Sequence, residues 1–96
     1  MEKLGENLVW PDKDPGDKRT FSVSGEDVWD SGETVASAVW TIPDGITKVG
    51  QNESGQEAFL TLQGGTDATT YTFTVAITTS TGSIWERDVK LRVRNL

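Results

Sequence analysis

The sequence contains no cysteine and no histidine among its 96 residues. Without cysteine, the chain has neither a disulfide nor a thiolate that could bind a metal or attack a substrate. Without histidine, it also lacks the commonest general base and the commonest ligand of transition metals. The sequence shows no Ser-x-x-Lys motif and no other convergent reactive set. We therefore expect a protein that is not an enzyme and that uses no cofactor.

Basic residues are also scarce, because nine lysines and arginines stand against fifteen aspartates and glutamates, for a net charge of −6. Residues 1–57 carry twelve acids and five bases, whereas residues 58–96 carry three acids and four bases. Nucleic-acid binding needs clustered cations, so we expect no nucleic-acid partner. No segment approaches the roughly 20 apolar residues that span a bilayer, and the N-terminus lacks the apolar run of a signal peptide. We expect a soluble protein with no membrane partner and no obvious export signal of its own.

What the chain does contain is a series of short segments in which apolar and polar residues alternate. A period of two is typical of strands with one buried face, and no window shows a convincing helical period. The longest alternation runs from Tyr71 to Thr78, where threonine suits the outer face because it is β-branched yet polar enough to face water. The residues predicted to face inward are Phe21, Val23, Ala36, Ala38, Trp40, Ile42, Ala58, Leu60, Leu62, Tyr71, Phe73, Val75, Ile77, Val89, Leu91 and Val93.

Turn signals separate these segments at residues 43–45, 52–55 and 80–82. About seven short strands at this spacing predict an all-β fold, an immunoglobulin-like antiparallel β-sandwich without a disulfide, over residues 19–96. Tyr71 opens the penultimate strand after a tight turn and fits a tyrosine corner, in which the hydroxyl bonds to nearby main chain. We expect that bond in the turn Gly65–Thr69, and we expect Trp40 in the core.

Residues 1–18 are predicted to form an acidic N-terminal arm, broken by Pro11 and Pro15, with a short strand around Leu8–Trp10. Asp12, Asp14 and Asp17 offer oxygen ligands at a spacing that suits Ca²⁺. The segment lacks the glycine and the terminal glutamate of the helix–loop–helix calcium site. The alternative is a solvated acidic turn at Pro15-Gly16, and the sequence favours that alternative over a metal site.

Two features are candidates for binding a partner. The first is Trp10, an apolar anchor on the arm, which an arm with few internal contacts would offer to another protein. We expect at least one of Trp10, Trp29 and Trp85 to be exposed, either at a partner interface or stacked on a sugar. The second is a basic stripe on the last strand, with solvated charge that discourages aggregation as the alternative. The stripe comprises Arg87, Lys90, Arg92 and Arg94.

Several motifs together resemble those of small structural proteins of tailed bacteriophages and prophages. The chain carries PDKDP at residues 11–15 and S-x-x-W-x-I-P-x-G-I at residues 37–46. It also carries L-x-G-G-T-x-x-T-x-Y at residues 62–71, I-T-T-S-x-G at residues 77–82 and E-R-x-x-x-L-R-V at residues 86–93. The resemblance covers most of residues 10–94, and its specificity lies in the combination of motifs.

Proteins of this kind are described as hypothetical phage proteins or fibre–tail adaptors. The resemblance implies an immunoglobulin-like virion structural protein without catalysis, made in the cytoplasm of the bacterial host. Its partners would be other virion proteins, which it would connect in the tail or in the head–tail region. The resemblance leaves the oligomeric state open. The alternative hypothesis is a carbohydrate-binding accessory domain, of a phage or a secreted protein, that contacts the host surface.

Overall fold

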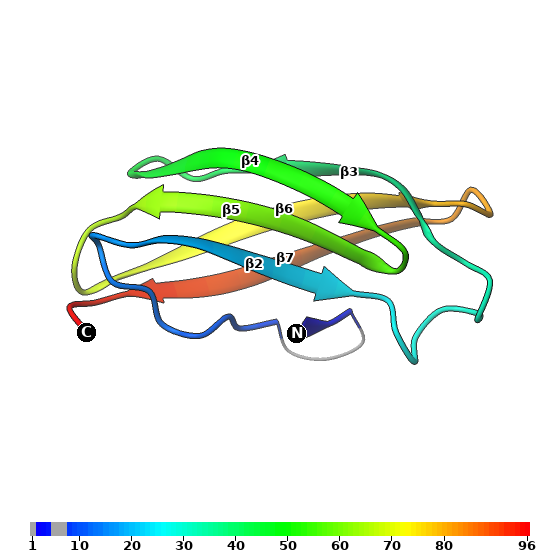
Figure 1. The fold of residues 1–96 in the computed structure, drawn as a ribbon, viewed down its shortest axis with the longest axis horizontal. Helices are drawn as coiled ribbons and strands as arrows, with labels where there is room; N and C mark the ends of the chain where they lie inside the picture. Colours follow the sequence, from blue (N-terminus) through cyan, green and yellow to red (C-terminus); the bar gives the residue numbers. More distant parts are fainter. Residues whose placement is uncertain (1, 5–7) are drawn as a thin grey trace.

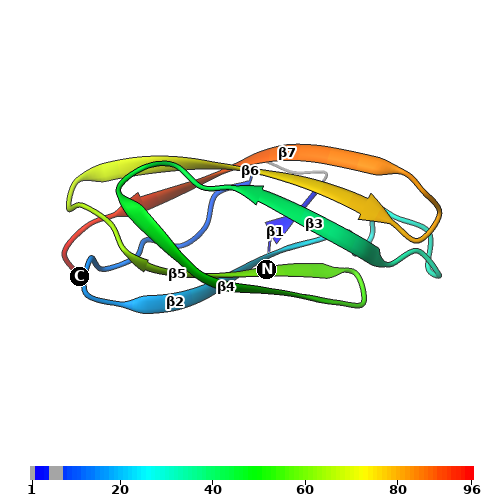
Figure 2. The ribbon, with the colours of Figure 1, turned by 90° about the horizontal axis from the view of Figure 1, so that it is seen from above.

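The computed structural model of the chain describes residues 2–4 and 8–96. Two sheets pack face to face, and Figure 2 shows the two layers. One sheet has the strand order β1-β2-β5-β4 and the other has the order β3-β6-β7 (Figure 1). The strands in the described residues are β1 (Glu2–Lys3), β2 (Lys18–Ser24), β3 (Val35–Thr41), β4 (Ile46–Ser54), β5 (Glu57–Gly64), β6 (Thr69–Thr79) and β7 (Ile84–Val93). The predicted all-β sandwich without a disulfide is confirmed.

The long strands pair in antiparallel fashion, with β5 between β2 and β4, and β6 between β3 and β7. Residues paired across neighbouring strands share a face, so the apolar rows of both sheets point into the space between them. The described part of the chain contains no helix that could cross a bilayer. The buried apolar side chains of the long strands are Phe21, Val23, Ala38, Trp40, Ile46, Ala58, Leu60, Leu62, Tyr71, Phe73, Val75, Ile77, Val89, Leu91 and Val93.

An aromatic cluster fills the centre of the sandwich. The ring of Trp10 stacks on Phe21 with a centroid distance of 4.9 Å. The same ring lies 5.7 Å from Trp40 and 5.6 Å from Phe73. Trp10 therefore contacts one aromatic residue of the β2 sheet and two of the opposite sheet. Its Nε1 donates a hydrogen bond to the carbonyl of Ser22 at 2.9 Å, which satisfies the indole within the core.

The N-terminal segment lies along the side of the sandwich between β2 and β7 (Figure 1). β1 pairs with β2 in parallel, and beyond residues 5–7 the chain runs in parallel beside β7. Parallel bridges join Val9 to Lys90 and Lys13 to Val93. The segment thus starts on one sheet and ends on the other. The strand expected around Leu8–Trp10 is only a bridge at Val9, because the pairing changes sheets, and the two-residue strand lies at β1 instead.

The expectation that Ala36 faces inward is wrong. Val35 pairs with Thr79 and Ser37 pairs with Thr78, so Ala36 is the extra residue of a β-bulge. The bulge shifts the alternation by one residue. As a result Ala36 is exposed, and Val35 packs against the core in its place.

The turn expected at residues 52–55 is shorter than predicted. β4 continues to Ser54, which pairs with Glu57, so the reversal itself is left to Gly55 and Gln56. Gly55 has a φ of 57°, which glycine adopts at little cost. β4 is the last strand of its sheet, and polar residues such as Asn52 are tolerated there because the strand is largely solvent-exposed.

Tyr71 makes the hydrogen bonds of a tyrosine corner. Its hydroxyl accepts a hydrogen bond from the N–H of Thr66 at 2.9 Å and donates one to the carbonyl of Gly45 at 3.4 Å. The side chain is 6% exposed, so water would not readily replace these partners. Gly45 has a φ of 97°, and a Cβ there would lie 3.1 Å from the hydroxyl. The corner therefore links the β3–β4 turn to the β5–β6 turn.

Candidate partner-binding surfaces

Trp10, the first candidate for a partner contact, is only 2% exposed. The expectation that the arm offers this ring to another protein is therefore wrong. The physical reason is that the arm pairs with β7 through main-chain hydrogen bonds, from Trp10 N to the carbonyl of Lys90 and from Lys90 N to the carbonyl of Leu8, both 2.9 Å long. This pairing places the ring between the sheets.

The other tryptophans are covered as well. Trp29 folds over Gly25, where a Cβ would lie 2.1 Å from the ring, so glycine is required at that position. Trp85 is half-buried, and the guanidinium of Arg87 stands 5.0 Å from the centroid of its ring. Trp40 lies in the core, as expected. Three of the four tryptophans are buried and Trp85 is half-buried, so the expectation of an exposed tryptophan is wrong.

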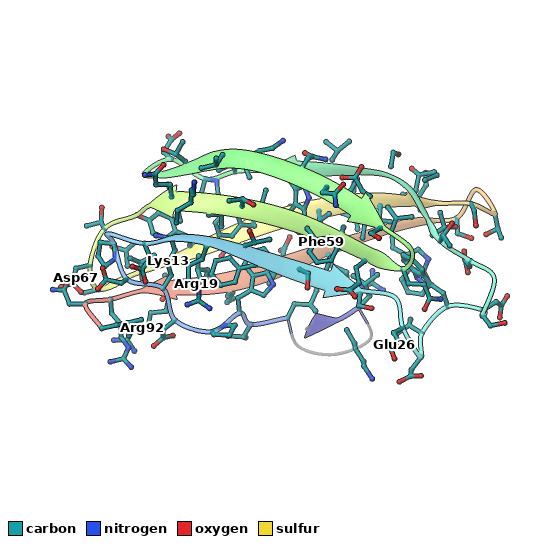
Figure 3. All side chains as sticks on the ribbon, in the orientation of Figure 1. Lys13, Arg19, Glu26, Phe59, Asp67 and Arg92 are labelled. Carbon is teal, nitrogen blue, oxygen red and sulfur yellow. The ribbon has the colours of Figure 1, made fainter. Side chains whose placement is uncertain are left out.

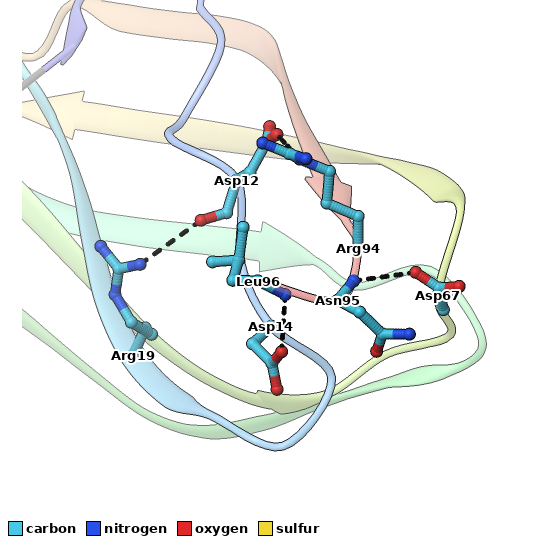
Figure 4. Close-up of polar contacts among 7 residues, drawn as sticks. All are labelled: Asp12, Asp14, Arg19, Asp67, Arg94, Asn95 and Leu96. Atoms are coloured by element: carbon cyan, nitrogen blue, oxygen red, sulfur yellow. Dashed lines mark hydrogen bonds and ion pairs between the residues drawn. The ribbon is translucent and has the colours of Figure 1, made fainter.

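The acidic turn holds the arm against the C-terminus (Figure 4). Asp12 forms an ion pair with Arg94, and the carbonyl of Asp12 accepts a hydrogen bond from Arg19 at 3.4 Å. Asp14 accepts hydrogen bonds from the N–H groups of Leu96 at 2.9 Å and Gly16 at 2.8 Å. These two main-chain donors hold the pKa of the Asp14 carboxyl below its ordinary value.

The carboxylates of Asp12, Asp14 and Asp17 do not converge. Within residues 2–4 and 8–96, no three aspartates, glutamates, histidines or cysteines gather into a group that could hold a metal ion. The N–H of Asp17 instead donates to the carbonyl of Asp14 at 3.1 Å, which closes a turn around Pro15 and Gly16. The geometry favours the structural turn over the calcium site.

Lys13 is the residue of this region that the sequence did not single out. It is fully buried, and its Nζ donates to the carbonyls of Gly64 at 2.6 Å and Asp14 at 2.9 Å (Figure 3). Burial lowers the pKa of the Lys13 ammonium, and the carboxylates of Asp17 and Asp14 oppose that effect. The residue therefore fastens the arm to the end of β5, and no motif distinguished it from a solvated lysine.

The predicted basic stripe is divided by the structure. Arg87 pairs with Val75 and so lies on the inner face of β7, where its Nε donates to the carbonyl of Leu4 at 3.3 Å. Its place in the stripe is a wrong expectation, because residues of one strand share a face only at even spacing. Lys90, Arg92 and Arg94 remain on the outer face. Arg94 pairs with Asp12, whereas Arg92 extends away from the sandwich (Figure 3).

At the opposite end of the sandwich, a buried carboxylate organises the loops. Glu33 is 8% exposed and accepts hydrogen bonds from the hydroxyls of Thr79 at 2.5 Å and Thr81 at 2.7 Å. These hydroxyls lower the pKa of the Glu33 carboxyl, the Thr79 bond being the larger cause. These hydrogen bonds join the loop at residues 25–34 to the β6–β7 turn. The Glu33 carboxylate therefore has a structural role.

The outer face of the β2-β5-β4 sheet carries an aromatic residue whose paired neighbours on both sides are uncharged. Phe59 is half-buried on this face, with Ser22 paired on one side and Asn52 on the other (Figure 3). The hydroxyls of Thr20 and Thr61 bond to each other at 2.8 Å on the same face. Sequence alternation implies this placement of Phe59, but among the aromatic residues the prediction of binding sites considered only the tryptophans.

The side of the sandwich between β3 and β4 is closed by a polar row. Gln51 donates from Nε2 to the carbonyl of Ala38 at 2.9 Å and to Glu53 at 3.1 Å, and its Oε1 accepts from Lys48. The N–H of Val35 on the same side donates to the carbonyl of Gly55 at 2.9 Å. No strand in the described part of the chain covers the outer edge of β4.

Comparison with known proteins identifies the family. A family model described as "Podophage GP4 fiber-tail adaptor protein gp77" matches residues 13–92, and the chain therefore belongs to this family of phage tail adaptors. A solved structure, the solution structure of the PKD domain from KIAA 1837 protein, is similar with a TM-score of 0.54 and 24% identity, covering 90% of this chain and 82% of that one. This likeness supports the immunoglobulin-like fold and nothing further. No curated protein matches.

Proposed function

We propose that this member of the fiber-tail adaptor family is a non-catalytic connector that binds other virion proteins in the phage tail. The observation that carries the proposal is the family match over residues 13–92, which spans the strands from β2 almost to the end of β7. We also propose that the chain is made in the host cytoplasm and incorporated into the virion.

The chemistry of the buried and shifted groups supports a non-catalytic role. Lys13 is bonded to main-chain carbonyls, Asp14 to main-chain N–H groups and Glu33 to threonine hydroxyls. Each pKa shift therefore has a structural cause. A catalytic group would need a free position next to a nucleophile or a substrate, and none of these three has one.

We propose the outer edge of β4 as the contact surface. In the described part of the chain, no strand lies beside the outer edge of β4, whereas the N-terminal segment flanks both β2 and β7. On β3, the N–H of Val35 donates to Gly55 and the carbonyl of Ala38 accepts from Gln51. A register shift between Lys48 and Gly50 makes Val49 a bulge, so the regular edge is Gly50–Ser54. An extended segment of a partner can add to such an edge through main-chain hydrogen bonds.

The test is a pull-down of the purified chain against the other tail proteins of the phage. Val49→Lys places a charge beside the proposed edge and should abolish or strongly reduce capture. Val9→Lys is the matched control, because the two valines are 49% and 55% exposed and the second lies on the arm. Equal capture by both variants would show that the edge of β4 is not the contact surface. Virions that assemble normally without this protein would contradict the connector role itself.

One observation favours a second candidate function, recognition of a neutral glycan on the host. Phe59 lies on the outer face of the β2-β5-β4 sheet, between its uncharged paired neighbours Ser22 and Asn52. An aromatic ring flanked by neutral hydrogen-bonding groups suits a sugar ring, which presents an apolar face and hydroxyls. Binding on a glycan array that is lost in Phe59→Ala and retained in Trp85→Ala would support it. An array without signal would exclude it.

A further inference from the structure

The outer face of β7 carries four charged side chains in a fixed order. Glu86, Asp88, Lys90 and Arg92 alternate with inward-facing residues, and all four are exposed. Their paired neighbours on β6 are small. The face beside the charges is therefore a flat row made by Ala76, Thr74, Thr72 and Thr70.

These four charges form no ion pair with any residue in the described part of the chain, where the ion pairs are Lys3–Asp27 and Arg94–Asp12. Asp88 accepts a hydrogen bond from the hydroxyl of Thr74 at 2.7 Å, and Lys90 reaches the hydroxyl of Thr72 at 3.4 Å. Successive outward residues of a strand are about 6.5–7 Å apart, too far for a direct ion pair between upright side chains. Opposite charges on another molecule can therefore pair with these four side chains.

The order of the charges along the strand is negative, negative, positive, positive. A two-fold axis that lies in the plane of the face, crosses β7 at right angles and passes level with Val89 reverses this order in a second copy. Glu86 then faces Arg92 of the second copy, and Asp88 faces Lys90. The pattern is complementary to itself, which is the requirement of an isologous interface.

We propose that two copies of this chain associate through the outer face of the β3-β6-β7 sheet, with their β7 strands antiparallel across the interface. Edge-to-edge pairing of β7 is blocked along Lys90–Arg94, because the arm already occupies the main-chain groups there. The flat threonine row allows the two sheets to approach to about 10 Å, the usual spacing of packed sheets. Each dimer contains four opposite-charge contacts, two of each kind.

The association is weak. Three strands span only about 10 Å between the outer two, so the face is smaller than a standard interface, which buries about 1,600 Å² in total. Each copy also has a net charge of −6, which opposes approach at long range. The dimer therefore forms only at high protein concentration. This inference does not depend on which virion protein the chain binds.

The test is sedimentation equilibrium of the full chain over a series of protein concentrations at 0.15 M salt. Glu86→Arg and Arg92→Glu each turn two attractive contacts of the dimer into repulsive ones, and each alone should weaken dimerisation about tenfold or more. An equimolar mixture of the two variants should restore it. In the mixed dimer Arg at position 86 faces Glu at position 92, and the unaltered Glu86 faces the unaltered Arg92.

The matched controls are Glu26→Arg and Lys18→Glu, which change the net charge by the same amounts at exposed positions away from this face. They should leave dimerisation within about twofold of the parent, because exposed substitutions away from a contact have small effects. Circular dichroism checks that every variant folds, and Asp88→Lys with Lys90→Asp provides an independent complementary pair. A parent that is monomeric at the highest concentration, or a mixture that stays monomeric, would overturn the proposal.

Discussion

On the side between β2 and β7, main chain closes the sandwich, whereas on the side between β3 and β4 side chains do so. The first side, termed the closed side, has the arm, with Trp10 in the core and four hydrogen bonds to β7 and the residue that follows it. The second side has the amide of Gln51; it is termed the open side because no strand in the described part of the chain lies beside the outer edge of β4. The free energy of folding is therefore concentrated on the closed side, and a partner can still add main-chain hydrogen bonds on the open side.

The largest expected effect follows from breaking the closed side. Trp10→Ala removes a ring that stacks on Phe21 and lies against Trp40 and Phe73. We expect a loss of about 3–5 kcal/mol in the free energy of unfolding, measured by urea denaturation, because a buried cavity forms between the sheets. Trp85→Ala is the control, since Trp85 is only half-buried and should cost less. A loss below about 1 kcal/mol for Trp10→Ala would show that the Trp10 ring contributes little to holding the two sheets together.

At one end of the open side, the tyrosine corner joins the β3–β4 turn to the β5–β6 turn. Tyr71→Phe leaves the N–H of Thr66 without its partner and removes the donor to Gly45. We expect a loss of about 1–3 kcal/mol in the same denaturation experiment. Thr72→Val, on the outer face of the same strand, should change stability little. If Tyr71→Phe were as stable as the parent, the corner would contribute nothing to joining the two turns.

A smaller effect is expected from acid on the closed side. The pKa of Asp14 is lowered from its ordinary value of 3.8, so the unfolded chain takes up a proton at higher pH than the folded chain does. The stabilisation is complete above that value and is lost as the pH falls through the folded pKa. Between pH 7 and pH 3, the urea midpoint of Asp14→Asn should therefore fall less than that of the parent. A parallel fall in the parent and in Asp14→Asn would refute the assignment.

The smallest effect is expected on the open side. Gln51→Ala removes the amide that covers the carbonyl of Ala38, but Gln51 is exposed and water can take its place. We expect a loss of no more than about 0.5 kcal/mol. Thermal unfolding resolves this difference when parent and variant are scanned together. A loss above about 2 kcal/mol would show that the two sides are closed to a similar degree.

Local alternation was enough to predict the inner faces of most strands. Leu60, Phe73 and Leu91 are fully buried, as the period of two requires. The prediction for Ala36 was wrong because a bulge adds one residue to β3. An alternating sequence does not indicate where such a register shift occurs. The position of Tyr71 after a tight turn was informative because the corner depends on contacts a few residues away, here Thr66.

The candidate surfaces were harder to predict because they depend on contacts far apart in the sequence. Trp10 and Lys13 look like residues of a polar arm until the pairing with β7 buries them. Arg87 looks like part of a basic stripe until the register assigns it to the inner face with Val75. The family was recognised from motifs, but the motifs did not show which surfaces remain free once the arm has folded against the sheets.

The parallel run of the arm beside β7 has a mechanical consequence. Four hydrogen bonds of 2.9–3.0 Å join the arm to β7 and the residue that follows it: Trp10 N to Lys90 O, Lys90 N to Leu8 O, Lys13 N to Arg92 O and Arg94 N to Lys13 O. Because the two segments run in parallel, pulling the start of the arm and Leu96 in opposite directions applies force along the strands. All four bonds are then loaded in shear at the same time. Force spectroscopy with handles on the arm and on Leu96 should therefore give a higher rupture force than handles on β4 and β5, whose antiparallel hairpin opens one bond pair at a time.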